Sequence, residues 1–123
     1  AEAAAHGWAV TICVSDAGGT PLVVRRHPDA FPASYDIAVG KARSAALFRK
    51  ETASLEVAVN TSNGGGGRAA MLSAPFILMR GGVPIVENGM CRGAVGVSGV
   101  KPEQDEKVAK AAIFALKSSV SKL

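Results

Sequence analysis

Residues 81–112 contain the pattern that most constrains the fold of this chain. Two apolar runs flank the dipeptide Asn88-Gly89, which readily takes the positive φ angles of a tight hairpin turn. Pro102 follows a glycine corner, and proline suits the first turn of a helix because its missing N–H is not needed there. Three acidic residues just after this proline suit the positive end of a helix dipole. The stretch therefore predicts a strand, a turn, a second strand and a helix.

The rest of the chain adds further elements to this unit. Alternating apolar residues and Gly/Pro punctuation predict the end of a helix over 1–6, strands over 8–15, 21–26 and 76–79, and helices over 34–50 and 52–59. With the strands over 83–87 and 90–97 and the helix over 102–120, the expected fold is α+β, a five-stranded antiparallel sheet flanked by helices. The 123 residues are expected to form one domain, 1–123.

Composition argues against several classes of protein. The net charge is +4, and basic residues are spread along the chain apart from the cluster Arg25-Arg26-His27, so no nucleic acid partner is expected. No apolar run approaches the roughly 20 residues that span a membrane. Cys13 and Cys91 lie inside predicted strands, which suits buried reduced thiols. A cytoplasmic protein is therefore expected.

The helix predicted over 34–50 carries a charge on its apolar stripe. That stripe consists of Ile37, Ala38, Ala45 and Phe48. At about 100° per residue, Lys41 falls in its middle. One interpretation is a lysine that extends to the helix edge or pairs with a carboxylate. The other is a pocket lysine that binds an anion or works as an acid or base, with Asp16, Glu103 or Asp105 as its partner.

Glycines outside tight turns allow two interpretations each. Four consecutive glycines precede Arg68, but no Gly-Lys-Ser/Thr follows, so this is not a Walker-type loop. It is either a flexible connector or a lid whose N–H groups and Arg68 hold a carboxylate or phosphate. Gly93 and Gly96 lie inside a predicted strand, where they permit either close helix packing or access for a flat ligand.

Several motifs together resemble a known family. They are Val-Ser-Asp-Ala-Gly-Gly at 14–19, Ser-Tyr-Asp-Ile-Ala at 34–38, Lys-Ala at 41–42, Gly-Gly-Val-Pro-Ile-Val at 81–86, Gly-Ala-Val-Gly-Val-Ser-Gly at 93–99 and Pro-Glu-Gln-Asp-Glu at 102–106. In this order they resemble the GlcG/HbpS family, often labelled haem-degrading, which includes the C-terminal domain of PduO-type corrinoid adenosyltransferases. The resemblance implies a profilin-like fold and homo-oligomers, from dimers to octamers, with pockets at subunit contacts.

The resemblance also implies candidate ligands and binding residues. Some members bind haem or cobalamin, and a haem-ligating histidine is expected near the N-terminus, where His6 is the candidate and would be the metal ligand. Residues 1–6 would be what remains of a longer N-terminal helix, and Tyr35 joins the ligand-binding candidates. His27, beside Pro28, is interpreted as a surface turn residue.

Three functions remain open on these grounds. The first is an oligomeric binding protein for haem or a related tetrapyrrole, with His6 as a ligand. The second is a small isomerase- or lyase-type enzyme acting on a carboxylate or carbonyl compound, with Lys41 and a carboxylate in acid–base roles and Arg68 on a lid. The third is a structural or regulatory oligomer without a ligand.

Overall fold

The computed structural model describes residues 1–60 and 69–121. Most of the predicted helices and strands are present, and the prediction fails between residues 69 and 80. In chain order the elements are α1 (Glu2–His6), β1 (Thr11–Asp16), β2 (Pro21–Arg26), α2 (Ser34–Phe48), α3 (Thr52–Asn60), the 3₁₀ helix η1 (Ala69–Ser73), β3 (Gly82–Glu87), β4 (Met90–Ser98) and α4 (Pro102–Ser121).

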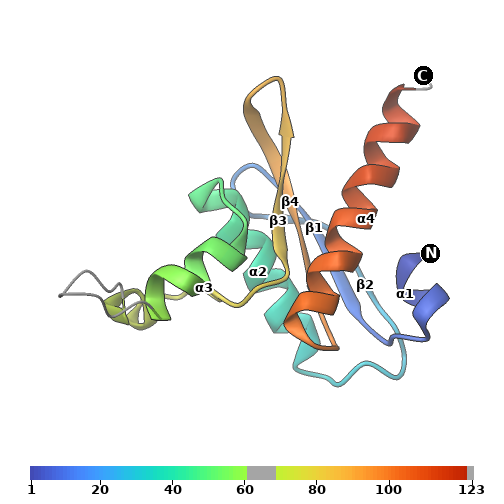
Figure 1. Ribbon diagram of the computed structural model, residues 1–123, viewed down its shortest axis with the longest axis horizontal. Helices are drawn as coiled ribbons and strands as arrows, with labels where there is room; N and C mark the ends of the chain where they lie inside the picture. The colour runs from blue at the N-terminus through green and yellow to red at the C-terminus, as the bar shows by residue number, and fades with distance from the viewer. Residues whose placement is uncertain (61–68, 122–123) are drawn as a thin grey trace.

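Four strands form one antiparallel sheet, in the order β2-β1-β4-β3 (Figure 1). The β3–β4 hairpin turns at Asn88 and Gly89, whose φ angles are 53° and 77°. Two consecutive positive φ angles are what a primed hairpin turn requires, as the sequence predicts. The α+β class is confirmed. The predicted number of strands is wrong, because the described residues contain four strands and not five.

The run 76–79 is the strand that was wrongly predicted. This segment packs on α2 instead of joining a sheet edge. The backbone N–H of Ile77 donates to Ser44 Oγ at 3.2 Å. The Phe76 ring meets the Phe48 ring edge-on, with centroids 5.0 Å apart. Phe76 and Ile77 therefore pack on a helix, and the apolar pattern of the run alone cannot distinguish this from pairing in a sheet.

Helices cover both faces of the sheet (Figure 1). One face packs on α2 through small side chains, which form the cluster Cys13, Ala38 and Ala42. The other face packs on α4, and the buried residues there are Val10, Val83, Val95, Val97, Val108, Ala109 and Ile113. The helix α1 lies beside α4. This arrangement leaves the outer strand β2 largely exposed.

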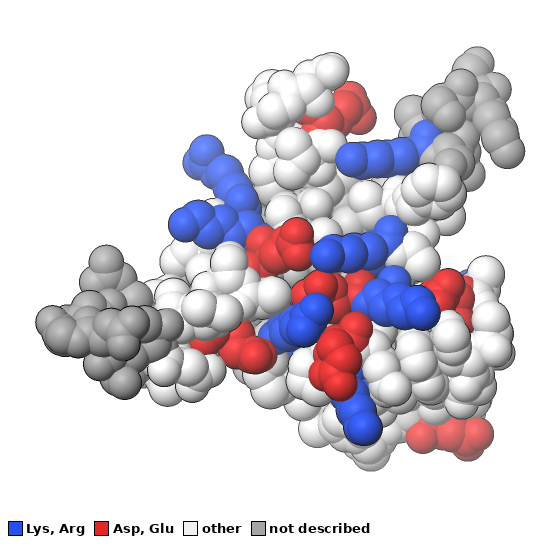
Figure 2. Space-filling view, viewed as in Figure 1, with Lys and Arg blue, Asp and Glu red and all other residues white. Residues whose placement is uncertain are grey.

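Both cysteines are free, as the sequence predicts. Cys13 lies under α2, and burial raises the pKa of its thiol to about 11, so it remains a neutral core residue. In the described part of the chain, none of the helices is both long and apolar enough to cross a membrane. On the face drawn in Figure 2, basic and acidic side chains are interspersed and do not form a patch of one sign.

Candidate functional site

Lys41 lies inside the protein and pairs with Asp105 of α4. The two side chains are 1% and 2% exposed. The Lys41 ammonium donates to Asp105 Oδ2 at 3.1 Å and to the carbonyl of Val97 at 2.8 Å. Asp105 Oδ1 accepts the backbone N–H of Val100 at 3.1 Å. The pair therefore ties α2 to α4 and to the end of β4.

Burial and charge act in opposite directions on this pair. Burial lowers the pKa of the Lys41 ammonium, and the neighbouring Asp105 carboxylate opposes that shift. Burial also raises the pKa of Asp105, against the ammonium and the hydrogen bond from Val100. A solute would reach these groups only if the surrounding helices moved apart, because both side chains are almost fully enclosed. The geometry therefore favours a structural ion pair.

The other two carboxylates considered for Lys41 lie in different places. Asp16 Oδ1 accepts the N–H groups of Gly18 and Thr20 at 2.9 and 3.0 Å, which stabilises the β1–β2 turn. Glu103 is exposed in the first turn of α4. Within the described residues neither forms an ion pair with Lys41. Of the three candidate partners, the structure brings only Asp105 into contact with the lysine.

Backbone atoms of neighbouring elements occupy the space where the two strand glycines lack a side chain. A Cβ at Gly96 would collide with Ala38 O and Ala42 N of α2, and one at Gly93 would collide with Ser15 O of β1. Both glycines are buried. The structure therefore shows backbone, and no open space, where a flat ligand was predicted to approach them. Gly96 serves close helix packing, which is the other role that the sequence allowed.

Of the two further predicted ligand-binding residues, the structure describes only Tyr35. Tyr35 lies in the first turn of α2 with 46% of its surface exposed. Arg68 lies outside the described residues, as does the glycine run that precedes it.

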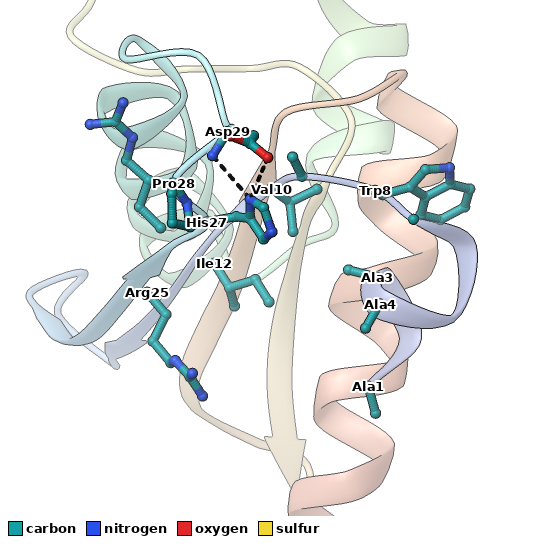
Figure 3. A pocket seen from close by; sticks show the side chains of 13 residues that line it. Ala1, Ala3, Ala4, Trp8, Val10, Ile12, Arg25, His27, Pro28 and Asp29 are labelled. Carbon is teal, nitrogen blue, oxygen red and sulfur yellow. Dashed lines mark hydrogen bonds and ion pairs between the residues drawn. The ribbon is translucent and has the colours of Figure 1, made fainter.

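A pocket of about 670 Å³ opens between α1 and the end of β2 (Figure 3). Trp8, Val10 and Ile12 contribute apolar surface, together with alanines of α1. Basic side chains of β2 and the residues just after it complete the lining. The full lining is Ala1, Ala3, Ala4, Gly7, Trp8, Ala9, Val10, Ile12, Arg25, Arg26, His27, Pro28 and Asp29. The pocket is thus apolar on one side and carries two arginines, a histidine and an aspartate on the other.

The two arginines of this pocket are differently engaged. Arg26 Nη2 donates to the carbonyl of Ala30 at 3.1 Å, which stabilises the segment after β2. Arg25 is the partner of Ile12 in the β1–β2 register, so the two side chains lie on the same face of the sheet. No hydrogen bond to the Arg25 guanidinium is formed by any described residue. Arg25 can therefore bind an anion without first breaking a contact.

His27 lines the pocket, whereas His6 does not. The His27 side chain is 52% exposed, and its Nδ1 accepts the N–H of Asp29 at 3.0 Å. His6 Nε2 lies 2.7 Å from Glu2 Oε2. The His6 ring stacks on Trp8 with centroids 4.2 Å apart. The structure thus places His27, predicted as a surface turn residue, in the pocket lining and leaves the predicted ligand His6 outside it; the cluster Arg25-Arg26-His27 was the sequence signal for this lining.

No group of three or more His, Cys, Asp or Glu side chains in the described part of the chain is arranged to hold a metal ion. A metal bound mainly by protein ligands needs several such donors. A metal carried inside a cofactor needs fewer, since haem iron is held in proteins by one or two axial ligands. A single imidazole in the pocket is therefore compatible with a metal cofactor but not with a conventional ion site.

Comparison with known proteins gives a consistent result. A family model described as "Haem degrading protein HbpS-like" matches residues 1–114. Protein GlcG of Escherichia coli (strain K12) is 45% identical over 98 residues, which are 79% of this chain and 69% of that protein. The fold is similar to the PduOC structure solved as a complex with haem, with a TM-score of 0.83, 31% identity and coverage of 93% of this chain and 83% of that one. It is also similar to a double mutant of HbpS from Streptomyces reticuli, with a TM-score of 0.81, 29% identity and coverage of 93% and 75%.

Proposed function

Because this chain belongs to the HbpS-like family, we propose that it is a haem-binding or haem-handling protein and that haem occupies the pocket between α1 and β2. Two findings support haem rather than another small molecule. The family model carries a haem-degrading description, and a structural relative was solved as a haem complex. Both concern relatives, so the proposal for this chain depends on whether its own residues suit the group.

The pocket lining is the observation that carries the proposal. Haem combines a flat apolar ring, a metal that takes axial imidazole ligands and two carboxylates. The lining offers apolar surface from Val10 and Ile12, an imidazole from His27 and a guanidinium from Arg25. Its volume of about 670 Å³ lies within the range of small-molecule sites. The residues present therefore fit the chemistry of haem, which would supply a redox-active iron when bound.

Titration with hemin tests this proposal directly. We expect the Soret band of hemin to shift and sharpen on adding the full chain. Ala4→Trp should fill part of the pocket and weaken binding, because Ala4 lines it on α1. Ala5→Trp is the matched control, since Ala5 is exposed on the same helix but lies outside the lining. An unchanged Soret band with the unmodified chain, or equal binding by both variants, would contradict the proposal.

Acid–base chemistry at Lys41 is the weaker alternative. It requires a substrate to reach an ammonium that is 1% exposed and already donates to Asp105 and to Val97. The pocket, in contrast, needs no movement of helices for a ligand to enter. We therefore assign the structural role to Lys41 and the ligand-binding role to the pocket.

Homo-oligomer formation, which the family resemblance implies, also belongs to the proposal. Leu22 at the start of β2, Val86 of β3 and Leu116 of α4 are 65%, 41% and 44% exposed. They line one apolar depression of about 600 Å³. Light scattering should detect more than one chain per particle, and Leu22→Glu should shift the mass toward the monomer. Leu72→Glu, at an equally exposed leucine of η1, should not.

A further inference from the structure

The two histidines near the pocket differ in what their free nitrogen can reach. His6 uses Nε2 to contact Glu2, and its ring is held against Trp8. Its Nδ1 has no hydrogen-bond partner among the described residues, but His6 does not line the pocket. His27 uses Nδ1, and no described residue forms a hydrogen bond with its Nε2. Of the two histidines, His27 is therefore the one that has a free ring nitrogen and also lines the pocket.

The position of the His27 ring is fixed by its neighbours on both sides. The backbone N–H of His27 donates to Val10 O at 3.0 Å, which holds the residue beside β1. Asp29 contacts the ring at Nδ1 through its N–H, and its Oδ2 lies 4.0 Å from the same nitrogen (Figure 3). Histidines that bind metals usually donate their second ring N–H to such a carboxylate or carbonyl. When Nε2 binds a metal, Nδ1 carries the ring proton and can donate it to Asp29 Oδ2, in place of the hydrogen bond that it accepts from the Asp29 N–H.

Arg25 provides a positive charge that can bind carboxylate groups at the pocket. Arg25 and Ile12 are register partners, so the aliphatic part of the Arg25 side chain lies beside Ile12 in the pocket lining. Arginine binds carboxylates through paired N–H groups, and the Arg25 guanidinium is free to do so. An amphipathic ring with an acidic edge would therefore meet apolar surface and a cation together.

On these observations we propose that His27 Nε2 is the axial ligand of the haem iron and that Arg25 pairs with a haem propionate. The inference rests on the proposed haem binding and specifies which residues perform it. It replaces His6, the ligand that the family resemblance implies.

Spectra of hemin with the full chain and two histidine variants test the iron ligand. We expect His27→Ala to lose the Soret position of the unmodified chain and to bind hemin more than about tenfold more weakly. His6→Ala should keep the Soret position and the hemin affinity of the unmodified chain. His27→Gln retains an acceptor for the Asp29 N–H but offers no imidazole, so it separates ligation from the structure of the turn. Far-UV circular dichroism verifies that each variant is folded.

Haem and its dimethyl ester together test the role of Arg25. Arg25→Gln should weaken haem binding by about two- to fivefold, the effect of one exposed ion pair, and leave binding of the uncharged ester unchanged. Lys50→Gln removes one positive charge from an exposed position after α2, outside both this pocket and the apolar depression, and should change the binding of neither haem nor its ester.

The outcomes separate this inference from the proposed function. If the unmodified chain binds hemin and His27→Ala keeps its spectrum, the inference is overturned while haem binding remains. Loss of the spectrum in His6→Ala alone would assign the iron to the other histidine. If the unmodified chain does not bind hemin, both proposals fail.

Discussion

Two regions of this protein carry charged or titratable side chains in apolar surroundings, and they are built differently. At Lys41 and Asp105 both partners are enclosed, and each makes a further hydrogen bond to the backbone. In the pocket, Arg25 and the Nε2 atom of His27 have no described partner and face an opening about 670 Å³ in volume. The first region is complete in itself, whereas the second has unused binding capacity.

This difference shows which charged residue near a core is a candidate for ligand binding. A lysine on an apolar helix stripe attracts attention in the sequence, but burial with satisfied hydrogen bonds is the usual condition of a structural charge. Exposed cations beside an apolar surface attract less attention, because most of them serve solubility alone. The availability of the polar atoms, rather than the degree of burial, separates the two regions here.

Replacing Lys41 should have the largest effect on stability. Lys41→Met leaves the Asp105 carboxylate buried without its cation, and breaking a buried pair in this way costs about 3–5 kcal/mol of unfolding free energy. Urea denaturation measures the loss. Hemin affinity of the folded variant should stay unchanged, because the lysine does not line the pocket. Lys50→Met, at an exposed lysine, should cost less than about 0.5 kcal/mol.

A double variant sharpens this test. Lys41→Met with Asp105→Asn removes both charges and keeps an acceptor for the Val100 N–H. If the pair is structural, this variant should recover at least about half of the stability lost in Lys41→Met. An unchanged stability in the single variant, or a loss of hemin binding in it, would break the distinction between the two regions.

Gly96→Ala should have the next largest effect. The added methyl would meet Ala38 O and Ala42 N, so α2 must shift, and such overpacking costs about 1–3 kcal/mol. The Soret spectrum with hemin should not change, because the glycine supports packing. Gly18→Ala is the control, since its added methyl would meet only Asp16 Oδ1 at ordinary contact distance. A changed Soret position in Gly96→Ala would restore the idea of a ligand at this strand.

A partly buried carboxylate on α4 should make stability depend on pH by a smaller amount. Burial raises the pKa of Glu106, but hydrogen bonds from Arg80 and Lys110 outweigh it and hold the pKa below its ordinary value of 4.5. The stabilisation is complete above pH 4.5 and is lost as the pH falls through the lowered value. Glu106→Gln should therefore be about 1 kcal/mol less stable at pH 7 and converge with the unmodified chain in acid.

Urea midpoints between pH 3 and pH 7 measure this difference. Glu87→Gln, at an exposed residue of β3, serves as the control and should follow the unmodified chain throughout. A constant gap between Glu106→Gln and the unmodified chain over this range would show that Glu106 does not provide the acid-sensitive stabilisation.

Most of the fold was predictable because local signals agreed with tertiary packing. Asn88-Gly89 and Pro102 define their turn and helix start through backbone preferences that act within a few residues. The run 76–79 failed because its apolar pattern suits a strand or a segment packed on a helix equally well. The contact between Ile77 and Ser44 that decides the matter joins residues 33 positions apart.

The site was less predictable for the same reason. A helical wheel correctly indicated that Lys41 faces inward, but its partner lies 64 positions away, and three carboxylates were compatible with the sequence. His27 follows a strand and precedes a proline, which is typical of an exposed turn. Its membership of a pocket depends on where α1 lies, and no local pattern around His27 contains that information.

His27→Gln should have the smallest effect on the stability of the ligand-free protein. The ring is half exposed, and its one hydrogen bond with Asp29 can be replaced by water, so we expect a change within about 0.5 kcal/mol. With hemin present, His27→Gln should become clearly less stable than the unmodified chain. A ligand at 100 times its Kd stabilises the folded state by about 2.7 kcal/mol, and the unmodified chain should gain this stability while His27→Gln gains much less. Urea denaturation with and without hemin measures the stability of the ligand-free protein and the stability gained on binding. Equal stabilisation of the two proteins by hemin would remove His27 from the binding site, and a large loss without hemin would place it with Lys41 among the structural residues.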